Sequence, residues 1–201
     1  LIVDTCVGND KSRFLTRKQA LQTKFLDHIA EAGFARETVD TVLCTHLHVD
    51  HVGWNTMLID GKWLPTFPKA RYLIGKTEYD HWVKETEGET SAIMADSVSP
   101  IFDAGLAHMV EMDHRLSPEF RLIPTSGHTP GHVSLVIESQ GERAVITGDM
   151  IHHPCQIPNP GWALPFDFDP DESTATRERM LADWEASLAL VIGTHFAAPT
   201  A

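Results

Sequence analysis

The sequence predicts a layered α/β protein. Segments with the pattern of β-strands alternate with segments that have the helical period of apolar residues, and no internal repeat interrupts this order. The run "DTVLCTH" is apolar without alternation, which indicates a strand covered on both faces. With 201 residues, of which 42% are hydrophobic, the chain is long enough for a proper core. We therefore expect one domain over residues 1–201.

The first elements follow in chain order. "LIVDT", residues 1–5, is expected to be a strand. A helix is expected over residues 16–32, because Thr16 and Gln19 form a capping-box pattern and Gly33 supplies a stop. Its apolar stripe would consist of Leu21, Phe25, Leu26 and Ile29. The strand "DTVLCTH" comes next, followed by the strand "ARYLIG" and the short helix "KTEYDHWVKE".

Strand patterns dominate the second half of the chain. "HMVEM", "FRLIPT", "HVSLVIE" and "RAVITGD" are expected strands, and the turn "SQGE" would join the last two in a hairpin. A loop rich in proline and aromatic residues covers residues 152–170. A final helix over residues 173–188, followed by the strand "LVIG", would turn four residues inward: Met180, Leu181, Trp184 and Leu188.

Composition excludes several function classes. The net charge of −12 argues against a nucleic-acid partner, because phosphate binding needs clustered Lys and Arg. No apolar stretch is long enough for a membrane span, so no membrane partner is expected. Cys6, Cys44 and Cys155 are odd in number and widely spaced, so they predict no disulfide framework and no zinc ribbon. The chain starts at Leu1, so residues upstream have been removed in this interpretation; a cytoplasmic location is slightly favoured, and an upstream signal peptide stays open.

The stretch "THLHVDHVGWN" concentrates polar side chains where a buried strand ends. In an extended segment His46, His48 and Asp50 point to one side, with backbones roughly 6–7 Å apart, a spacing that two imidazoles can close around one ion. His51 breaks the alternation, and Gly53 gives the backbone freedom to turn. A polar loop with several histidines is the plainer alternative, but four candidate ligands at this spacing favour a metal site.

Three further candidate ligands follow other strands. His128 lies in "TSGHTPGH", Asp149 ends "VITGDM" and His195 ends "VIGTH". Each is preceded by an apolar run and a glycine. Since four neighbouring side chains cannot fill the coordination shells of two metals, these residues are the expected remaining ligands.

The motifs "HLHVDH", "GHTPGH", "TGDM" and "GTH", in this order, resemble those of the metallo-β-lactamase superfamily over nearly the whole chain. The resemblance implies a four-layer αβ/βα sandwich, here without its first strands, and two divalent metal ions, zinc before iron, manganese or cobalt. His46, His48 and His128 would bind one metal, Asp50, His51 and His195 the other, and Asp149 both. This implies a dinuclear hydrolase in which a metal-bridging hydroxide attacks the substrate, and Asp50 would take up a proton.

Other polar and aromatic residues receive weaker assignments. His132 would orient a ligand or form an ordinary loop hydrogen bond. His152 or His153 would face the cavity, and His152 is the expected third catalytic residue beside Asp50 and Asp149. Four aromatic residues would line an apolar pocket or only pin down a loop: Trp54, Trp162, Phe166 and Phe168.

The substrate is expected to be a small molecule. The chain is most similar to the branch of lactonases and methyl-parathion hydrolases, which implies a lactone, an ester or a phosphotriester. Quorum-signal lactonases often carry a tyrosine after the bridging aspartate; here no tyrosine follows Tyr79, so His152 replaces it or an activated ester or phosphotriester is preferred. A thioester hydrolase similar to glyoxalase II and a non-catalytic module stabilised by metal stay open as alternatives, and a homodimer is a further possibility.

Overall fold

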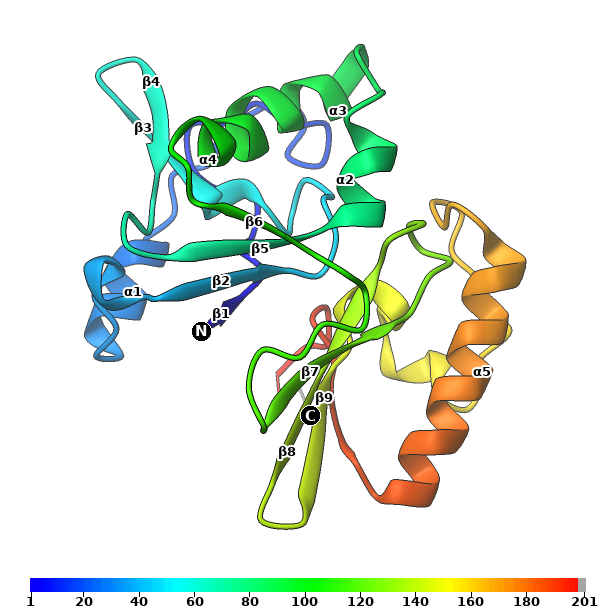
Figure 1. Ribbon diagram of the computed structural model, residues 1–201. Helices are drawn as coiled ribbons and strands as arrows, with labels where there is room; N and C mark the ends of the chain where they lie inside the picture. The colour runs from blue at the N-terminus through cyan, green and yellow to red at the C-terminus, as the bar shows by residue number, and fades with distance from the viewer. Residues whose placement is uncertain (199–201) are drawn as a thin grey trace. The chain divides into compact units, whose positions relative to one another are not determined.

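The computed structural model describes residues 1–198, which form two four-stranded sheets together with helices and a short hairpin. The sheets belong to two compact units (Figure 1). The N-terminal unit comprises Leu1–Ile74 and Tyr79–Met109, and the C-terminal unit comprises Gly75–Glu78 and Val110–Ala201. The α/β class that the alternating pattern predicts is therefore present in each unit.

The sheet of the N-terminal unit has the order β1-β2-β5-β6. Strands β1, β2 and β5 are parallel, with Val3 opposite Leu43 and Leu43 opposite Leu73. Parallel strands are normally covered on both faces, and all four residues of β2 are buried, as its unbroken apolar run predicts. The strands are Ile2–Val3 (β1), Thr41–Cys44 (β2), Arg71–Gly75 (β5) and Ala107–Val110 (β6).

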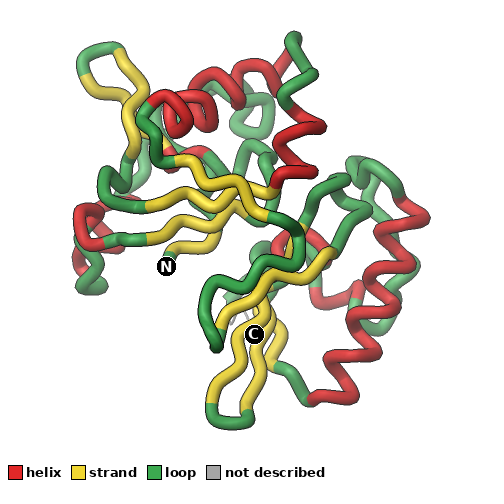
Figure 2. Tube along the Cα trace, viewed as in Figure 1, coloured by secondary structure: helices red, strands yellow, loops and turns green. Residues whose placement is uncertain are grey.

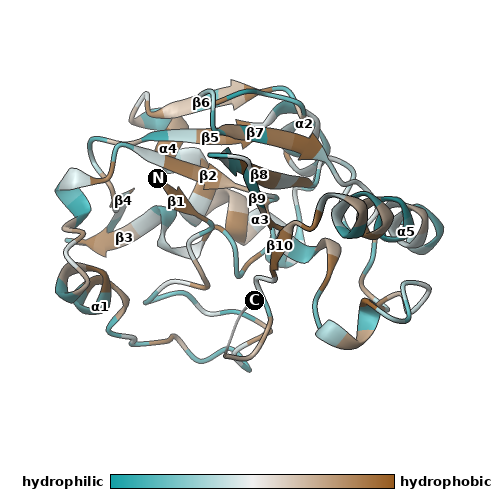
Figure 3. Ribbon diagram, turned by 90° about the horizontal axis from the view of Figure 1, so that it is seen from below, coloured by the Kyte–Doolittle hydropathy of each residue, from teal (hydrophilic) through white to brown (hydrophobic). Residues whose placement is uncertain are grey.

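Helices pack on this sheet through one apolar core, which contains Val42, Tyr72, Val98 and Ile101. Figure 3 shows β1 and β2 in the colour of hydrophobic residues. The helices are α1 (Phe25–Glu31), α2 (Lys76–Trp82), α3 (Gly88–Ile93) and α4 (Ser99–Asp103), with a π-helical segment, Met94–Val98, between the last two.

The expected helix over residues 16–32 is wrong in its first half, because α1 starts only at Phe25. The side chain of Asn9 accepts hydrogen bonds from the backbone and the hydroxyl of Thr23, and Arg17 and Lys18 adopt positive φ angles. The Thr16 hydroxyl donates to the Gln19 carbonyl instead of capping a helix. Contacts with the N-terminal loop therefore replace the helical hydrogen bonds.

A hairpin that the sequence analysis did not predict joins β3 (Thr56–Ile59) and β4 (Lys62–Pro65). Its two-residue turn is Asp60-Gly61, with φ angles of 50° and 76°. This is the Asp-Gly signal of a type I′ turn, so the sequence did contain the information.

The C-terminal unit has the sheet order β10-β9-β8-β7. Here β8 and β9 form the predicted antiparallel hairpin, and β10 lies parallel to β9. The bounds are Phe120–Pro124 (β7), Val133–Ser139 (β8), Glu142–Ile146 (β9) and Leu190–Ile192 (β10).

Helix α5 (Pro170–Ser187) packs on this sheet, with Trp184 in one core with Val136 and Val145. Met180 and Leu181 pack against the same core, as predicted. Leu188 was wrongly expected to face inward: it is 89% exposed, because the helix ends one residue earlier and Leu188 adopts a left-handed conformation.

Most candidate ligands lie in the loops that follow strands, and Figure 2 shows loops in green between the yellow strands and red helices. Among residues 1–198, no helix is both long and apolar enough to cross a membrane.

Candidate metal centre

The first histidine cluster follows β2 in the N-terminal unit. The ring of His46 lies 4.0 Å from that of His51 and 4.6 Å from that of His48, measured between centroids. A turn in which the His51 amide donates to the His48 carbonyl brings these rings together. Asp50 lies beside them, with one carboxylate oxygen 3.8 Å from Nε2 of His51. The structure thus joins the four residues of the predicted motif.

Asp4 fixes the protonation of two of these histidines. Its Oδ2 atom accepts from the Thr45 hydroxyl and lies 2.8 Å from Nδ1 of His51. Because the Thr45 hydrogen points to Asp4, the Thr45 oxygen can only accept from Nδ1 of His46, which is 3.0 Å away. Both Nδ1 atoms therefore carry hydrogen, so Nε2 is the atom through which each neutral imidazole can bind a metal.

The contacts of Asp4 were not predictable from the strand pattern of residues 1–5. Asp4 has a φ angle of 57°, and its amide is held by the Leu43 carbonyl at 2.8 Å. Its Oδ1 atom accepts from the amide of Thr45. A non-glycine residue held in a left-handed conformation is a site of backbone strain, which is common at functional sites. The sequence signal that could have identified Asp4 is its position directly after a strand, where the candidate ligands also lie.

The N-terminal segment also fixes the turn after the cluster. The amides of Gly53 and Trp54 donate to the carbonyls of Cys6 and Thr5. A Cβ atom on Gly53 would lie 1.9 Å from the backbone of Val7, so only glycine fits. The buried ammonium of Lys11 donates to the Gly53 carbonyl at 2.7 Å. Burial outweighs the effect of Asp96 and lowers the pKa of Lys11 to about 8.

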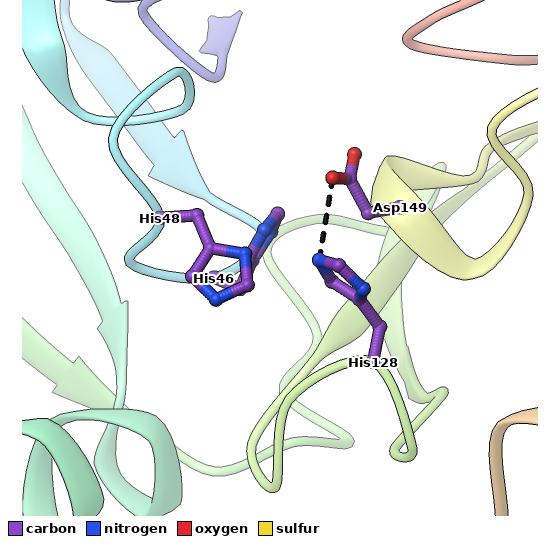
Figure 4. Close-up of side chains that lie close together, drawn as sticks. All are labelled: His46, His48, His128 and Asp149. Atoms are coloured by element: carbon purple, nitrogen blue, oxygen red, sulfur yellow. Dashed lines mark ion pairs between the residues drawn. The ribbon is translucent and has the colours of Figure 1, made fainter. Parts of the chain in front are cut away.

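The second cluster lies within the C-terminal unit and centres on Asp149. Nε2 of His128 is 3.3 Å from Oδ2 of Asp149, and Nε2 of His195 is 3.2 Å from Oδ1. Figure 4 shows the ion pair of His128 with Asp149. Ligand atoms that share a tetrahedral zinc ion at 2.0–2.1 Å lie roughly 3.3–3.4 Å apart. The separations therefore fit metal ligands, and the two oxygens of Asp149 face different histidines.

His128 is held from behind by Asp167, another residue that the sequence analysis missed. Oδ1 of Asp167 lies 3.0 Å from Nδ1 of His128, and both side chains are buried. Burial lowers the pKa of His128, but Asp149 and Asp167 outweigh this and raise it overall. For Asp167, burial raises the pKa of the carboxyl, but the bonds from His128 and the Leu164 amide lower it overall.

Glycines allow close packing of the loop that carries His128. A Cβ atom on Gly131 would lie 2.2 Å from the amide nitrogen of Glu78, and one on Gly127 would lie 2.2 Å from that of Ser173. The Gly131 amide donates to the buried carboxylate of Glu78. The glycines of "GHTPGH" therefore position the loop against its neighbours.

The ring of His132 contacts the backbone of the candidate ligand Asp149. Nε2 of His132 accepts from the Asp149 amide at 2.9 Å, so Nδ1 carries the hydrogen and donates to Thr125. The Thr125 hydroxyl then donates to Ser134, whose hydroxyl donates to the Thr147 carbonyl. These hydrogen bonds all run in one direction, from His132 to Thr147, and every residue in the series is buried.

His152, and not His153, faces the second cluster. Its Nε2 atom is 3.0 Å from Oδ2 of Asp149, and its ring stacks on that of His195 with 3° between the planes. His153 instead accepts from the amide of Cys155 and caps a short helical turn, Pro154–Gln156. Of the two alternatives, the cluster thus contains His152.

The aromatic residues divide between the two predicted roles. Trp54 is buried and stacks on Phe25 in the N-terminal unit, so it serves the core. Phe166 is 57% exposed and meets the rings of His128 and His152 edge-on, at 6.0 and 5.4 Å between centroids. Trp162 and Phe168 are also more than half exposed. Phe166 is therefore the apolar surface next to the second cluster.

Comparison with known proteins agrees with the motifs. The family model described as "Metallo-beta-lactamase superfamily" matches residues 1–195. An N-acyl homoserine lactonase of Bacillus thuringiensis is 24% identical over 129 residues, which are 64% of this chain and 45% of that protein. The chain spans about half the length of the curated relatives it matches.

Solved structures show the same fold. The hydrolase AbOPH of the β-lactamase superfamily matches with a TM-score of 0.77 and 28% identity, over 88% of this chain and 64% of that one. AidC, a dizinc quorum-quenching lactonase in complex with a product, matches with a TM-score of 0.79 and 23% identity, over 98% and 68%. The predicted fold is confirmed by these likenesses.

Proposed function

Because the chain belongs to the metallo-β-lactamase superfamily, we propose that it acts as a hydrolase with two divalent metal ions, zinc in the first place. His46, His48 and His128 would hold one ion, and Asp50, His51 and His195 the other, with Asp149 on both. The observation that carries this proposal is the orientation of the rings: Nδ1 of His46, His51 and His128 each lies within 3.0 Å of a neighbouring oxygen, so Nε2 is the ring atom that would bind a metal.

Two bound ions would lower the pKa of a water molecule toward neutrality and polarise the substrate's carbonyl or phosphoryl oxygen. Asp149 suits a bridging position because its two oxygens face His128 and His195 separately. Asp50, with 24% of its side chain exposed, can take a proton from the attacking water and pass it to solvent. His152 faces Asp149, so we propose that it would lie near the carbonyl or phosphoryl oxygen of the substrate, on which negative charge develops when the hydroxide attacks the carbon or phosphorus.

A lactone with an apolar acyl group is the proposed substrate class, and aryl esters and phosphotriesters are the alternatives. The similarity to N-acyl homoserine lactonases supports this choice. The exposed ring of Phe166 beside His152 supports it independently, because it offers an apolar surface at the cluster. No basic groove is needed for such a neutral substrate.

Activity assays of the metal-replete protein with a panel of substrates test the proposal. The protein should bind about two metals per chain and hydrolyse one class among lactones, aryl esters, phosphotriesters and thioesters, and a chelator should abolish the activity. Asp149→Ala should remove turnover, whereas Asp183→Ala, at an exposed position of α5, should not. Thioester turnover alone would favour the glyoxalase-like alternative, and bound metal without any turnover would favour a structural module.

A further inference from the structure

The loop that precedes α5 contains a buried carboxylate that the proposed reaction does not use. Asp167 is 8% exposed as a residue, and its side chain is 1% exposed. A buried carboxylate is costly unless it is paired. The partners of Asp167 include the Nδ1 atom of His128, the side chain of Ser173 and the Leu164 amide, which donates to Oδ2 at 3.0 Å.

The same short loop is fastened to the segment around His128 by backbone hydrogen bonds. The Phe168 amide donates to the His128 carbonyl at 3.1 Å, and the Asp169 amide donates to the Gly127 carbonyl at 2.9 Å. The side chain of Asp169 in turn caps the first turn of α5. Three consecutive residues therefore link α5 to the ligand His128.

The residue before Asp167 has the opposite environment. Phe166 is exposed, and its ring stands edge-on to both His128 and His152. The backbone conformation that places the Asp167 carboxylate behind His128 thus also determines where the Phe166 ring lies in front of it.

We propose that Asp167 is a positioning residue, which orients His128 for its metal and holds Phe166 as the contact for the apolar part of the substrate. This inference rests on the proposed function. An asparagine at position 167 could still accept the proton of Nδ1, or the bond of Leu164, but without the charge that strengthens both.

The test compares metal binding and kinetics in the metal-replete protein. Asp167→Asn should weaken metal affinity 10- to 100-fold, the range found for groups that orient metal-bound histidines, as measured by zinc competition with a chromogenic chelator. It should also raise KM for lactones with long acyl chains. Phe166→Ala should raise KM for the same substrates and leave the metal affinity unchanged. Asp183→Asn is the matched control and should change neither.

Asp167→Glu keeps the charge and should restore part of the metal affinity, which a purely structural defect would not show. Circular dichroism establishes that each variant is folded; Asp167→Glu carries the test if Asp167→Asn does not fold. Metal affinity of folded Asp167→Asn within twofold of the unchanged protein overturns the inference and leaves the proposed function intact. Failure of the unchanged protein to bind zinc would instead overturn the proposed function.

Discussion

Asp4→Asn is expected to destabilise the protein even without metal, because one carboxylate organises the first histidine cluster. The Asp4 carboxylate accepts from the Thr45 amide, from the Thr45 hydroxyl and from Nδ1 of His51, each at 2.8 Å. Asparagine keeps the shape of the side chain, and it tolerates the φ angle of 57°. The substitution therefore changes the hydrogen bonding and leaves the backbone energy nearly unchanged.

The magnitude follows from the number of acceptors. An amide group has one oxygen, so at least one of the three donors would face the NH₂ group. An unsatisfied buried donor costs about 1–3 kcal/mol, and the remaining bonds lose the charge assistance of the carboxylate. We expect a loss of about 2–4 kcal/mol in the free energy of unfolding. Asp4→Ala should lose roughly 1–2 kcal/mol more, because alanine does not favour a positive φ angle.

Urea unfolding of the chelator-treated protein measures this loss. The slope of the free energy of unfolding against urea concentration should be the same in both proteins, which would show that the substitution does not change the compactness of the folded or unfolded state. A loss below about 1 kcal/mol for Asp4→Asn would refute the reasoning. Zinc competition measured on the same variant should also show an affinity that is lower by 10- to 100-fold.

Three other outcomes are expected. Gly131→Ala should lower the melting temperature strongly or prevent folding, because the added Cβ atom would clash with the Glu78 backbone. The control Gly161→Ala should leave the melting temperature unchanged, because its Cβ atom would have no neighbour within 4 Å. Equal effects of the two substitutions would contradict the packing argument. The pKa of Lys11 in the folded state is about 8 and its ordinary value is 10.5; at this side chain the unfolded state binds more protons between these values, so the contribution of Lys11 to the free energy of unfolding should rise from pH 8 to 10. In urea unfolding this rise, on the order of 1–3 kcal/mol, should disappear in Lys11→Met. Removing metal should lower the melting temperature, since an ion at ~1,000 times its Kd adds about 4 kcal/mol of stability. Scanning calorimetry with and without chelator measures the melting temperature, and equal values in the two conditions would contradict this prediction.

Much of the fold follows from local sequence signals. The buried strand β2 and the hairpin of β8 and β9 were predictable because their apolar patterns and turn residues agree with their final environment. The first half of the expected helix over residues 16–32 was not, because the side chain of Asn9 binds Thr23 across the loop. Such a contact between distant residues overrides a capping pattern, and no local signal reveals it.

The candidate site, like the fold, was predictable from the sequence only in part. The histidines of the "HLHVDH" motif are recognisable because their spacing is unusual, and the structure brings them together. Asp4 and Asp167 look like any other carboxylate in the sequence, and only their contacts with ring nitrogens single them out. The candidate metal ligands thus form a pattern in the sequence, whereas the residues that orient them can be identified only from the tertiary structure.

Asp4 and Asp167 have the same kind of consequence, each for one histidine of its own unit. Each carboxylate sets the ring orientation and tautomer of a histidine from its own unit. An incoming ion would therefore meet imidazoles already turned the right way, and little rotamer entropy would be lost on binding. A stripped protein should regain its ions quickly and without refolding.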